Sequence, residues 1–300
     1  MKLVVLLVVL ALRRLDFAWP GAFLRRERFS EALAPLRDRV EGIGLPAVLR
    51  WAVLVLVPVA VVALLLCLLH SVLWGLPGFI AGGVLLLWLL GAESEFRQQE
   101  SLLERGRMND PEAFSEAAER HFGMRGDVDD AGDAEQPDYF TRLYRRIVRQ
   151  DARQLFATVF WLIALGYWAA LLYVLNLTLV REESLREESL DESAPEPSPA
   201  RLMHTALFWL PSRLLVLCLA LAGNFGRVAD AVSGRVWKLD DGEALLDDAL
   251  EGALEKPDPA AQAQDRLQAG VDRLEELQGV LLRCLAIWLI LAAIWIVITG

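Results

Sequence analysis

The sequence predicts an all-α, polytopic integral membrane protein with four transmembrane helices, and up to six, together with cytoplasmic amphipathic helices. Hydrophobic residues make up 55% of its 300 residues, and the mean hydropathy of +0.37 is well above that of an ordinary soluble domain. The ten tryptophans fit such a protein, because tryptophan collects at the two interfaces of a bilayer. Since no segment shows a sustained alternation of apolar and polar residues, no strand is predicted.

Four apolar runs predict the transmembrane helices, at residues 51–73, 79–91, 155–177 and 280–299. The first two runs are separated by a short segment that contains Gly and Pro, so together they predict a helical hairpin. Gly78 and Gly82 have the spacing of small residues that lets two helices approach closely, and we interpret both as structural.

Two further runs raise the possible number of spans to six. Residues 3–12 are apolar and are followed by two arginines without a signal-peptidase site, which predicts an uncleaved short span or a partly inserted helix. Residues 202–223 are apolar but contain Pro211, which removes a backbone donor and tends to kink or end a helix. We interpret Pro211 as a corner in a broken membrane or interfacial helix.

The polar segments between these runs carry apolar residues at helical spacing. This holds for residues 29–40, for residues 140–148 and for residues 267–277, and Asp110 before Pro111 predicts the start of another helix. The predicted parts are a short hydrophobic segment with an Arg-rich amphipathic helix (1–50), a transmembrane hairpin (51–91), a cytoplasmic helical segment (92–153), a transmembrane helix (154–178), an acidic repeat with a Pro-rich loop (179–201), a broken membrane or interfacial helix (202–223), a polar helical segment (224–279) and a C-terminal transmembrane helix (280–300).

Arginine content predicts the orientation of these parts. Residues 13–50 and 142–153 are rich in Arg, whereas residues 71–77 contain no Lys or Arg, so the positive-inside rule places the first two inside and the hairpin tip outside. The third span then runs outward, and residues 181–200, with a repeated Arg-Glu-Glu-Ser-Leu pentad, form an external loop. This loop is either a solvated linker or a strip that binds an ion or a partner. The side of residues 224–279 depends on whether residues 202–223 cross.

Composition and motifs exclude several classes of function. The net charge of −10 argues against a nucleic-acid-binding protein. No nucleotide-binding loop, metalloprotease motif or serine-hydrolase motif occurs, and the three cysteines lie inside apolar runs, where they read as small buried hydrophobic residues. The sequence therefore predicts no cofactor and no metal site.

Polar residues at membrane depth are the first candidates for a binding site. Asn176 and Thr178 lie at the end of the third span, and Arg213 follows Pro211 in the next apolar run. Because Arg presents a planar fork of donors, Arg213 is suited to hold a carboxylate or phosphate group. The alternative is an interfacial arginine that reaches water or pairs with a nearby carboxylate.

Several landmarks occur in order along the chain. A Leu-Phe-Ala-Thr-Val-Phe-Trp sequence ending at Trp161 opens one span, Asn176 and Thr178 close it, and Phe-Trp209-Leu-Pro211-Ser-Arg213-Leu opens the next. With an upstream Arg-Met-Asn109-Asp110 element, this ordered set resembles the AmpE family of inner-membrane regulatory signalling modulators over nearly the whole chain. It is more distantly similar to the CbiB/CobD-type membrane proteins of cobalamin biosynthesis.

The AmpE resemblance implies a multi-pass protein of the bacterial inner membrane that modulates β-lactamase induction and cell-wall recycling together with a muramyl-amidase. Its partners would be the lipid bilayer and a muropeptide or other envelope-derived ligand. We therefore predict a non-catalytic regulator. The candidate ligand-binding residues are Arg213, Asn109, Asp110, Trp161, Asn176, Thr178 and Trp209.

The alternative implied by the more distant similarity is an ATP-dependent ligase of the CbiB/CobD type or a diverged relative. The sequence departs from that pattern at its acidic positions: Gln150 and Asp151 replace a Glu-Asn pair, and no Asp-Asp pair precedes Trp209. Without those groups the chain lacks the carboxylates that would hold magnesium for ATP chemistry. A transporter is disfavoured because no inverted repeat or pair of broken helices is found.

Overall fold

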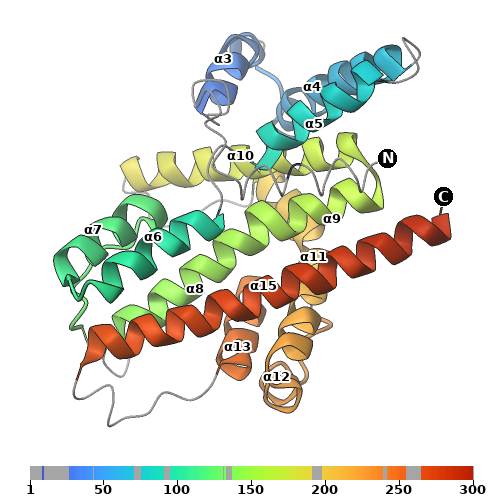
Figure 1. The fold of residues 1–300 in the computed structure, drawn as a ribbon. Helices are drawn as coiled ribbons and strands as arrows, with labels where there is room; N and C mark the ends of the chain where they lie inside the picture. The colour runs from blue at the N-terminus through green and yellow to red at the C-terminus, as the bar shows by residue number, and fades with distance from the viewer. Residues whose placement is uncertain are drawn as a thin grey trace. The chain divides into compact units, whose positions relative to one another are not determined.

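The computed structural model describes residues 9, 27–42, 44–70, 76–90, 95–130, 132, 137–190, 198–238, 242–254 and 265–299. Every regular element in these ranges is a helix, which confirms the all-α prediction (Figure 1). Three helical segments are long and apolar enough to cross a membrane, Ala47–Leu68, Pro199–Ala222 and Arg266–Trp295, and Ile80–Leu90 is a shorter apolar helix. The chain divides into two compact units: Met1–Ala92 with Ala157–Phe208, and Glu93–Phe156 with Trp209–Gly300.

Unit 1 contains α3 (Glu27–Gly42), α4 (Ala47–His70), α5 (Leu76–Leu90), α9 (Ala157–Ala164), α10 (Tyr167–Leu190) and the first part of α11 (Pro199–Ala222). The predicted hairpin is present, because α4 and α5 pack against each other and both contact α10. A Cβ atom at Gly82 would lie 2.8 Å from the Tyr167 ring, so this glycine allows α5 to approach α10. Gly78 lies in α5, but its surroundings are outside the described part of the chain.

The third predicted span, residues 155–177, is not a single helix. Gly166 has a φ of +102°, a conformation that favours glycine, and its N–H donates to the carbonyl of Trp161 at 3.1 Å. This interaction ends α9, and α10 turns back from it (Figure 1). The eight residues of α9 rise about 12 Å, less than half of a hydrocarbon core of about 30 Å.

The reversal at Gly166 also corrects the predicted orientation. Arg37 of α3 forms an ion pair with Glu182 of α10, although the arginine content placed these two residues on opposite sides of the membrane. At the start of α4, the Trp51 Nε1–H donates to Asn176 Oδ1 of α10 at 2.8 Å. The acidic repeat is not a loop either, because α10 continues helically to Leu190. The Pro-rich residues 191–197 lie outside the described ranges.

Unit 2 contains α6 (Glu95–Arg107), α7 (Pro111–Phe122), α8 (Tyr139–Asp151), the π-helical turn η2 (Ala152–Phe156), the rest of α11, α12 (Phe225–Ala231), α13 (Gly242–Ala253) and α15 (Arg266–Thr299). The predicted apolar faces of α8 and α15 are buried. They pack closely because Gly270 has no side chain; a Cβ there would lie 2.2 Å from the Phe140 ring. The predicted helix start at Asp110 is confirmed, since Asp110 Oδ1 accepts the N–H of Ala113 at 2.9 Å.

The predicted corner at Pro211 is wrong. Residues 199–222 form one continuous helix, α11, with Pro211 inside it. The C-terminal span is confirmed as a helix, and its amphipathic start and apolar end belong to the same element, α15. Of the short N-terminal run at residues 3–12, only Val9 lies within the described part of the chain.

Candidate functional site

The helix α11 remains continuous through Pro211 because another side chain satisfies the carbonyl that the proline leaves free. A proline removes the N–H that would bond the carbonyl four residues earlier, which here belongs to Leu207. The indole Nε1–H of Trp161 donates to this oxygen at 3.2 Å. The Trp161 side chain therefore replaces the hydrogen bond that the proline at position 211 cannot make within α11.

Asn176 is fully buried and ties three helices together. Its Oδ1 accepts from Trp51 of α4, and its Nδ2 donates to the carbonyl of Ala200 in α11 at 3.0 Å. Thr178, by contrast, bonds within its own helix, to the carbonyl of Val174. Of the two predicted polar positions of the third span, Asn176 therefore organises the packing of unit 1 and Thr178 does not.

Replacing Asn176 by leucine should loosen this packing. The change removes both contacts and leaves the Trp51 indole and the Ala200 carbonyl without them, at a cost of about 1–2 kcal/mol for hydrogen bonds between membrane helices. In thermal unfolding in micelles, Asn176→Leu should have a lower midpoint than the control Thr178→Val. The control removes a hydroxyl that bonds within α10. Equal midpoints for the two variants would contradict this role.

Arg213 is enclosed by backbone carbonyls of its own helix and of the segment that follows α11. Its side chain is turned toward residues 232–238, and Nε–H donates to the carbonyl of Val236 at 3.1 Å, while Nη2–H donates to that of Lys238 at 2.6 Å. Nη1 donates to the Trp209 carbonyl at 3.3 Å and to Ser212 Oγ at 2.9 Å.

These contacts decide what Arg213 can do. A guanidinium has five N–H groups, and four hydrogen bonds leave at most one for a ligand. The residue is 9% exposed, and its guanidinium lies 5.1 Å from the centre of the Trp209 ring. Arg213 therefore anchors residues 236–238 to α11, and it is not the water-exposed or carboxylate-paired arginine that was the alternative expectation. Binding of an anion by Arg213 stays a prediction.

Asn109 and Asp110 lie at the exposed turn between α6 and α7. Asn109 has a φ of +55°, which Asn tolerates better than most residues, and Asp110 caps α7. Among the described residues, the contacts of Arg213 involve neither of them, so the structure does not join these candidates into one site.

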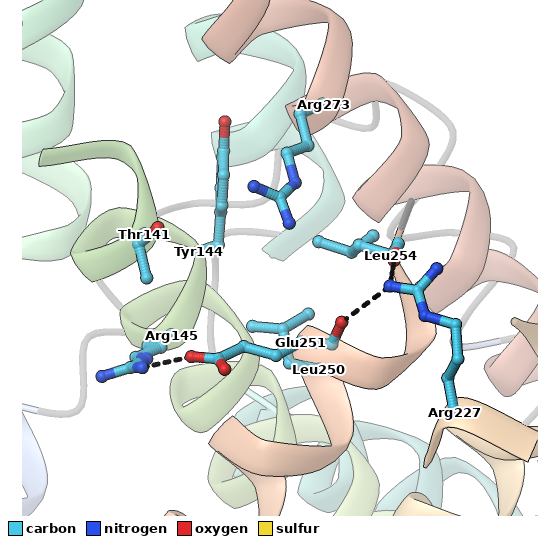
Figure 2. A pocket seen from close by; sticks show the side chains of 8 residues that line it. All are labelled: Thr141, Tyr144, Arg145, Arg227, Leu250, Glu251, Leu254 and Arg273. Carbon is cyan, nitrogen blue, oxygen red and sulfur yellow. Dashed lines mark hydrogen bonds and ion pairs between the residues drawn. The ribbon is translucent and has the colours of Figure 1, made fainter. Parts of the chain in front are cut away.

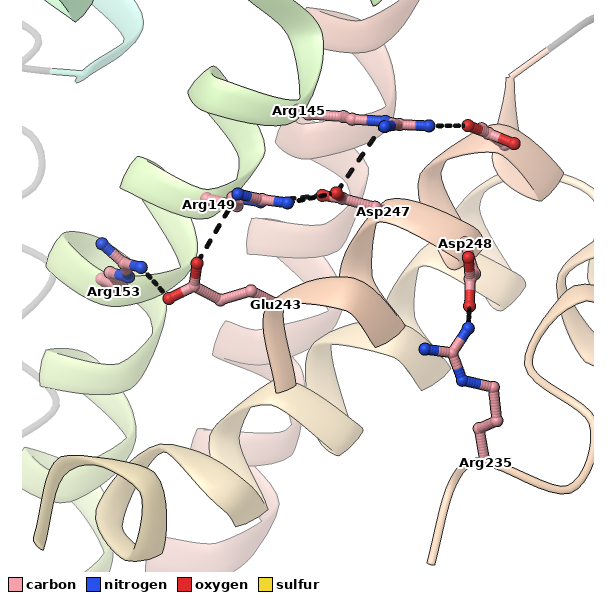
Figure 3. Close-up of polar contacts among 8 residues, drawn as sticks. Arg145, Arg149, Arg153, Arg235, Glu243, Asp247 and Asp248 are labelled. Atoms are coloured by element: carbon pink, nitrogen blue, oxygen red, sulfur yellow. Dashed lines mark hydrogen bonds and ion pairs between the residues drawn. The ribbon is translucent and has the colours of Figure 1, made fainter. Parts of the chain in front are cut away.

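Sequence reasoning missed a contact between basic side chains of α8 and η2 and acidic side chains of α13 (Figure 3). Three arginines spaced four residues apart face three carboxylates spaced four residues apart. The two rows run antiparallel, so the first arginine pairs with the last carboxylate. We call this set the α8–α13 ladder, and it comprises Arg145, Arg149, Arg153, Glu243, Asp247 and Glu251.

Asp247 is the centre of the ladder. It accepts two hydrogen bonds from Arg149, one of them from Nε to Oδ1 at 3.0 Å, and its Oδ2 lies 3.8 Å from Nε of Arg145 (Figure 3). Two parallel bonds between a guanidinium and a carboxylate are a strong, directional pairing. The spacing of four residues in both segments is visible in the sequence. The arginines were interpreted only through the positive-inside rule, so their pairing with the carboxylates was not predicted.

The family model described as "Regulatory signalling modulator protein AmpE" matches residues 1–240. No curated protein and no solved structure gives a significant match, and the more distant similarity to CbiB/CobD-type proteins is not shown. The match covers most of the chain, and the described residues include three helices that are long and apolar enough to span a membrane. The chain therefore belongs to the AmpE family of regulatory signalling modulators.

Proposed function

We propose that this protein is a multi-pass, non-catalytic regulator in the bacterial inner membrane that modulates β-lactamase induction and cell-wall recycling. It acts together with a muramyl-amidase and responds to a muropeptide or another envelope-derived ligand. The observation that carries this proposal is the AmpE family match over residues 1–240. The three membrane-capable helices agree with it.

The roles of the landmark residues support a regulator in preference to an enzyme. Trp161 and Asn176 satisfy backbone carbonyls of α11, and Arg213 anchors the segment that follows α11. These side chains, which carry the family resemblance, are engaged in holding the helices together. Most of the hydrogen-bonding groups of Trp161, Asn176 and Arg213 therefore bond to other parts of the chain, as expected for residues that maintain the helix packing.

Contacts within each unit support a specific membrane topology. In unit 2 the α8–α13 ladder and the packing of α6 against α15 support a location of α6, α8, α13 and the polar start of α15 on one side of the membrane. In unit 1 the pair of Arg37 and Glu182 requires α3 and the end of α10 to share one side. We therefore propose that α4, the shorter apolar helix α5 and α15 cross the membrane and that α9 and α10 form a re-entrant hairpin. On this topology α11, although long and apolar enough to span, has both of its ends on the cytoplasmic side.

Deleting the gene in a host with an inducible β-lactamase tests the regulatory role. We expect the β-lactamase activity induced by a β-lactam to change several-fold in the deletion strain, and a plasmid copy of the gene to restore it. A strain that lacks both this gene and the muramyl-amidase gene should show the same induction as a strain that lacks the amidase gene alone, because both proteins act on the same signal. Induction curves that match the parent strain would contradict the proposal, and additive effects would contradict the partnership.

A further inference from the structure

Unit 2 contains a pocket of about 280 Å³ between α8, α12, α13 and α15 (Figure 2). We propose that this pocket binds the phosphate group of a small ligand, a site that does not depend on the proposed regulatory function. The residues that line it are Thr141, Tyr144, Arg145, Arg227, Leu250, Glu251, Leu254 and Arg273.

The charge of the lining favours an anion. Three guanidinium groups and one carboxylate line the pocket, which leaves an excess of positive charge among the lining residues, while the carboxylates of Asp138, Asp272 and Glu276 lie near Tyr144 outside the lining. Arg145 and Glu251 pair with each other, so the excess belongs to Arg227 and Arg273, which come from different helices (Figure 2). A phosphate monoester carries a charge of about −1.5 to −2 at neutral pH, which matches these two arginines.

The two arginines keep donors for a ligand. Arg227 uses one nitrogen, Nη2, to bond the carbonyls of Glu251 and Leu254. Arg273 stacks on Tyr144, with its Cζ 5.8 Å from the ring centre, and its buried Nε makes no hydrogen bond among the described residues. A guanidinium fork binds phosphate oxygens in pairs, so each of these two lining side chains is suited to bind a phosphate group in the pocket.

The rest of the lining indicates a ligand with a short apolar portion. Leu250, Leu254 and the ring of Tyr144 form an apolar wall, and Thr141 adds a hydroxyl. The Tyr144 hydroxyl is engaged with the carbonyl of Gly270 at 2.7 Å. Burial raises the pKa of Tyr144, so this hydroxyl stays protonated and adds no negative charge to the pocket.

Two sources of such a phosphate group are consistent with the position of the pocket. Arg273 precedes the apolar part of α15, which begins near Val280, by about 10 Å along the helix axis. This distance is comparable to the thickness of the headgroup region. The ligand is therefore either a soluble phosphate ester or the headgroup of an anionic lipid.

Binding experiments on the full-length protein distinguish these sources. The protein in phosphatidylcholine nanodiscs would be titrated calorimetrically with glycerol phosphate, and a second preparation containing phosphatidic acid would be analysed for retained lipid by native mass spectrometry. We expect saturable binding of at least one of the two. Arg273→Gln should weaken it about tenfold or more, since a charge-assisted hydrogen bond is lost, and Arg273→Lys should weaken it less.

A matched control is Arg125→Gln, because Arg125 belongs to the same unit but pairs with Glu119 on an exposed surface. Binding of glycerol phosphate that depends on Arg273 identifies a soluble ester. Retention of phosphatidic acid that depends on Arg273, without binding of glycerol phosphate, identifies a headgroup. The proposal is overturned if the unmodified protein binds neither, or if Arg273→Gln binds as well as Arg125→Gln. Arg227→Gln is a second variant; if it does not fold, Arg273→Gln decides the question alone.

Discussion

Replacing Arg213 by alanine should destabilise unit 2 by about 2–3 kcal/mol, because hydrogen bonds from a charged donor are lost and neutral carbonyls are left without it. The variant loses four hydrogen bonds, and the carbonyls of Val236 and Lys238 lose their charged donor. Of the hydrogen bonds between side chains of α11 and residues 236–238, only the long one from the Trp209 indole to the Lys238 carbonyl, at 3.4 Å, then remains. Thermal unfolding in micelles, followed by circular dichroism, should show a clearly lower midpoint for Arg213→Ala.

Two further variants sharpen this result. Arg213→Lys keeps the charge but cannot reach the carbonyls of both Val236 and Lys238 with a planar fork, so its midpoint should lie between those of the alanine variant and the unmodified protein. Arg235→Ala removes an arginine from the same segment that forms only a partly exposed pair with Asp248, and should cost about 0–1 kcal/mol. If Arg213→Ala unfolds at the same temperature as Arg235→Ala, Arg213 does not anchor this segment.

Replacing Asp247 by alanine is the second change with a large expected effect. Asp247 is 7% exposed and accepts two hydrogen bonds from Arg149, so its loss leaves the arginine charges of α8 without their central partner. We expect a loss of about 2–3 kcal/mol, since Arg149 itself remains in contact with solvent. Denaturant unfolding in micelles should show a lower midpoint than for the unmodified protein.

The neighbouring residue provides the control for Asp247. Asp248 pairs with Arg235 outside the ladder, and both side chains are about one third to one half exposed. Asp248→Ala should therefore cost about 0–1 kcal/mol. Equal losses for Asp247→Ala and Asp248→Ala would show that the ladder does not hold α13 against α8.

The features that the sequence predicted correctly depend on residues close together in the chain. Helical spacing identified the buried faces of α8 and α15, and the Asp110–Pro111 pair identified the start of α7. The break at Gly166 was missed because a glycine inside an apolar run also fits close helix packing. The positive φ of Gly166 depends on the direction in which α10 leaves α9, and the hydropathy of the sequence gives no information on that direction.

The features that the sequence predicted wrongly depend on distant partners. Pro211 looked like a corner, but the Trp161 side chain, many residues earlier, bonds the carbonyl that the proline frees. The interfacial alternative for Arg213 is wrong for the same reason, because its acceptors include backbone carbonyls 23 and 25 residues later. Such carbonyls have no distinctive sequence, so this environment could not be predicted.

Reporter fusions at residues 190 and 245 test the proposed topology of this membrane regulator most directly. Green fluorescent protein fluoresces only when fused to a cytoplasmic position, and alkaline phosphatase is active only when exported. A fusion at residue 74, in the tip of the hairpin, serves as the control for an exported position. We predict fluorescence at both 190 and 245, with phosphatase activity at 74. Phosphatase activity at 190 or 245 would contradict the account.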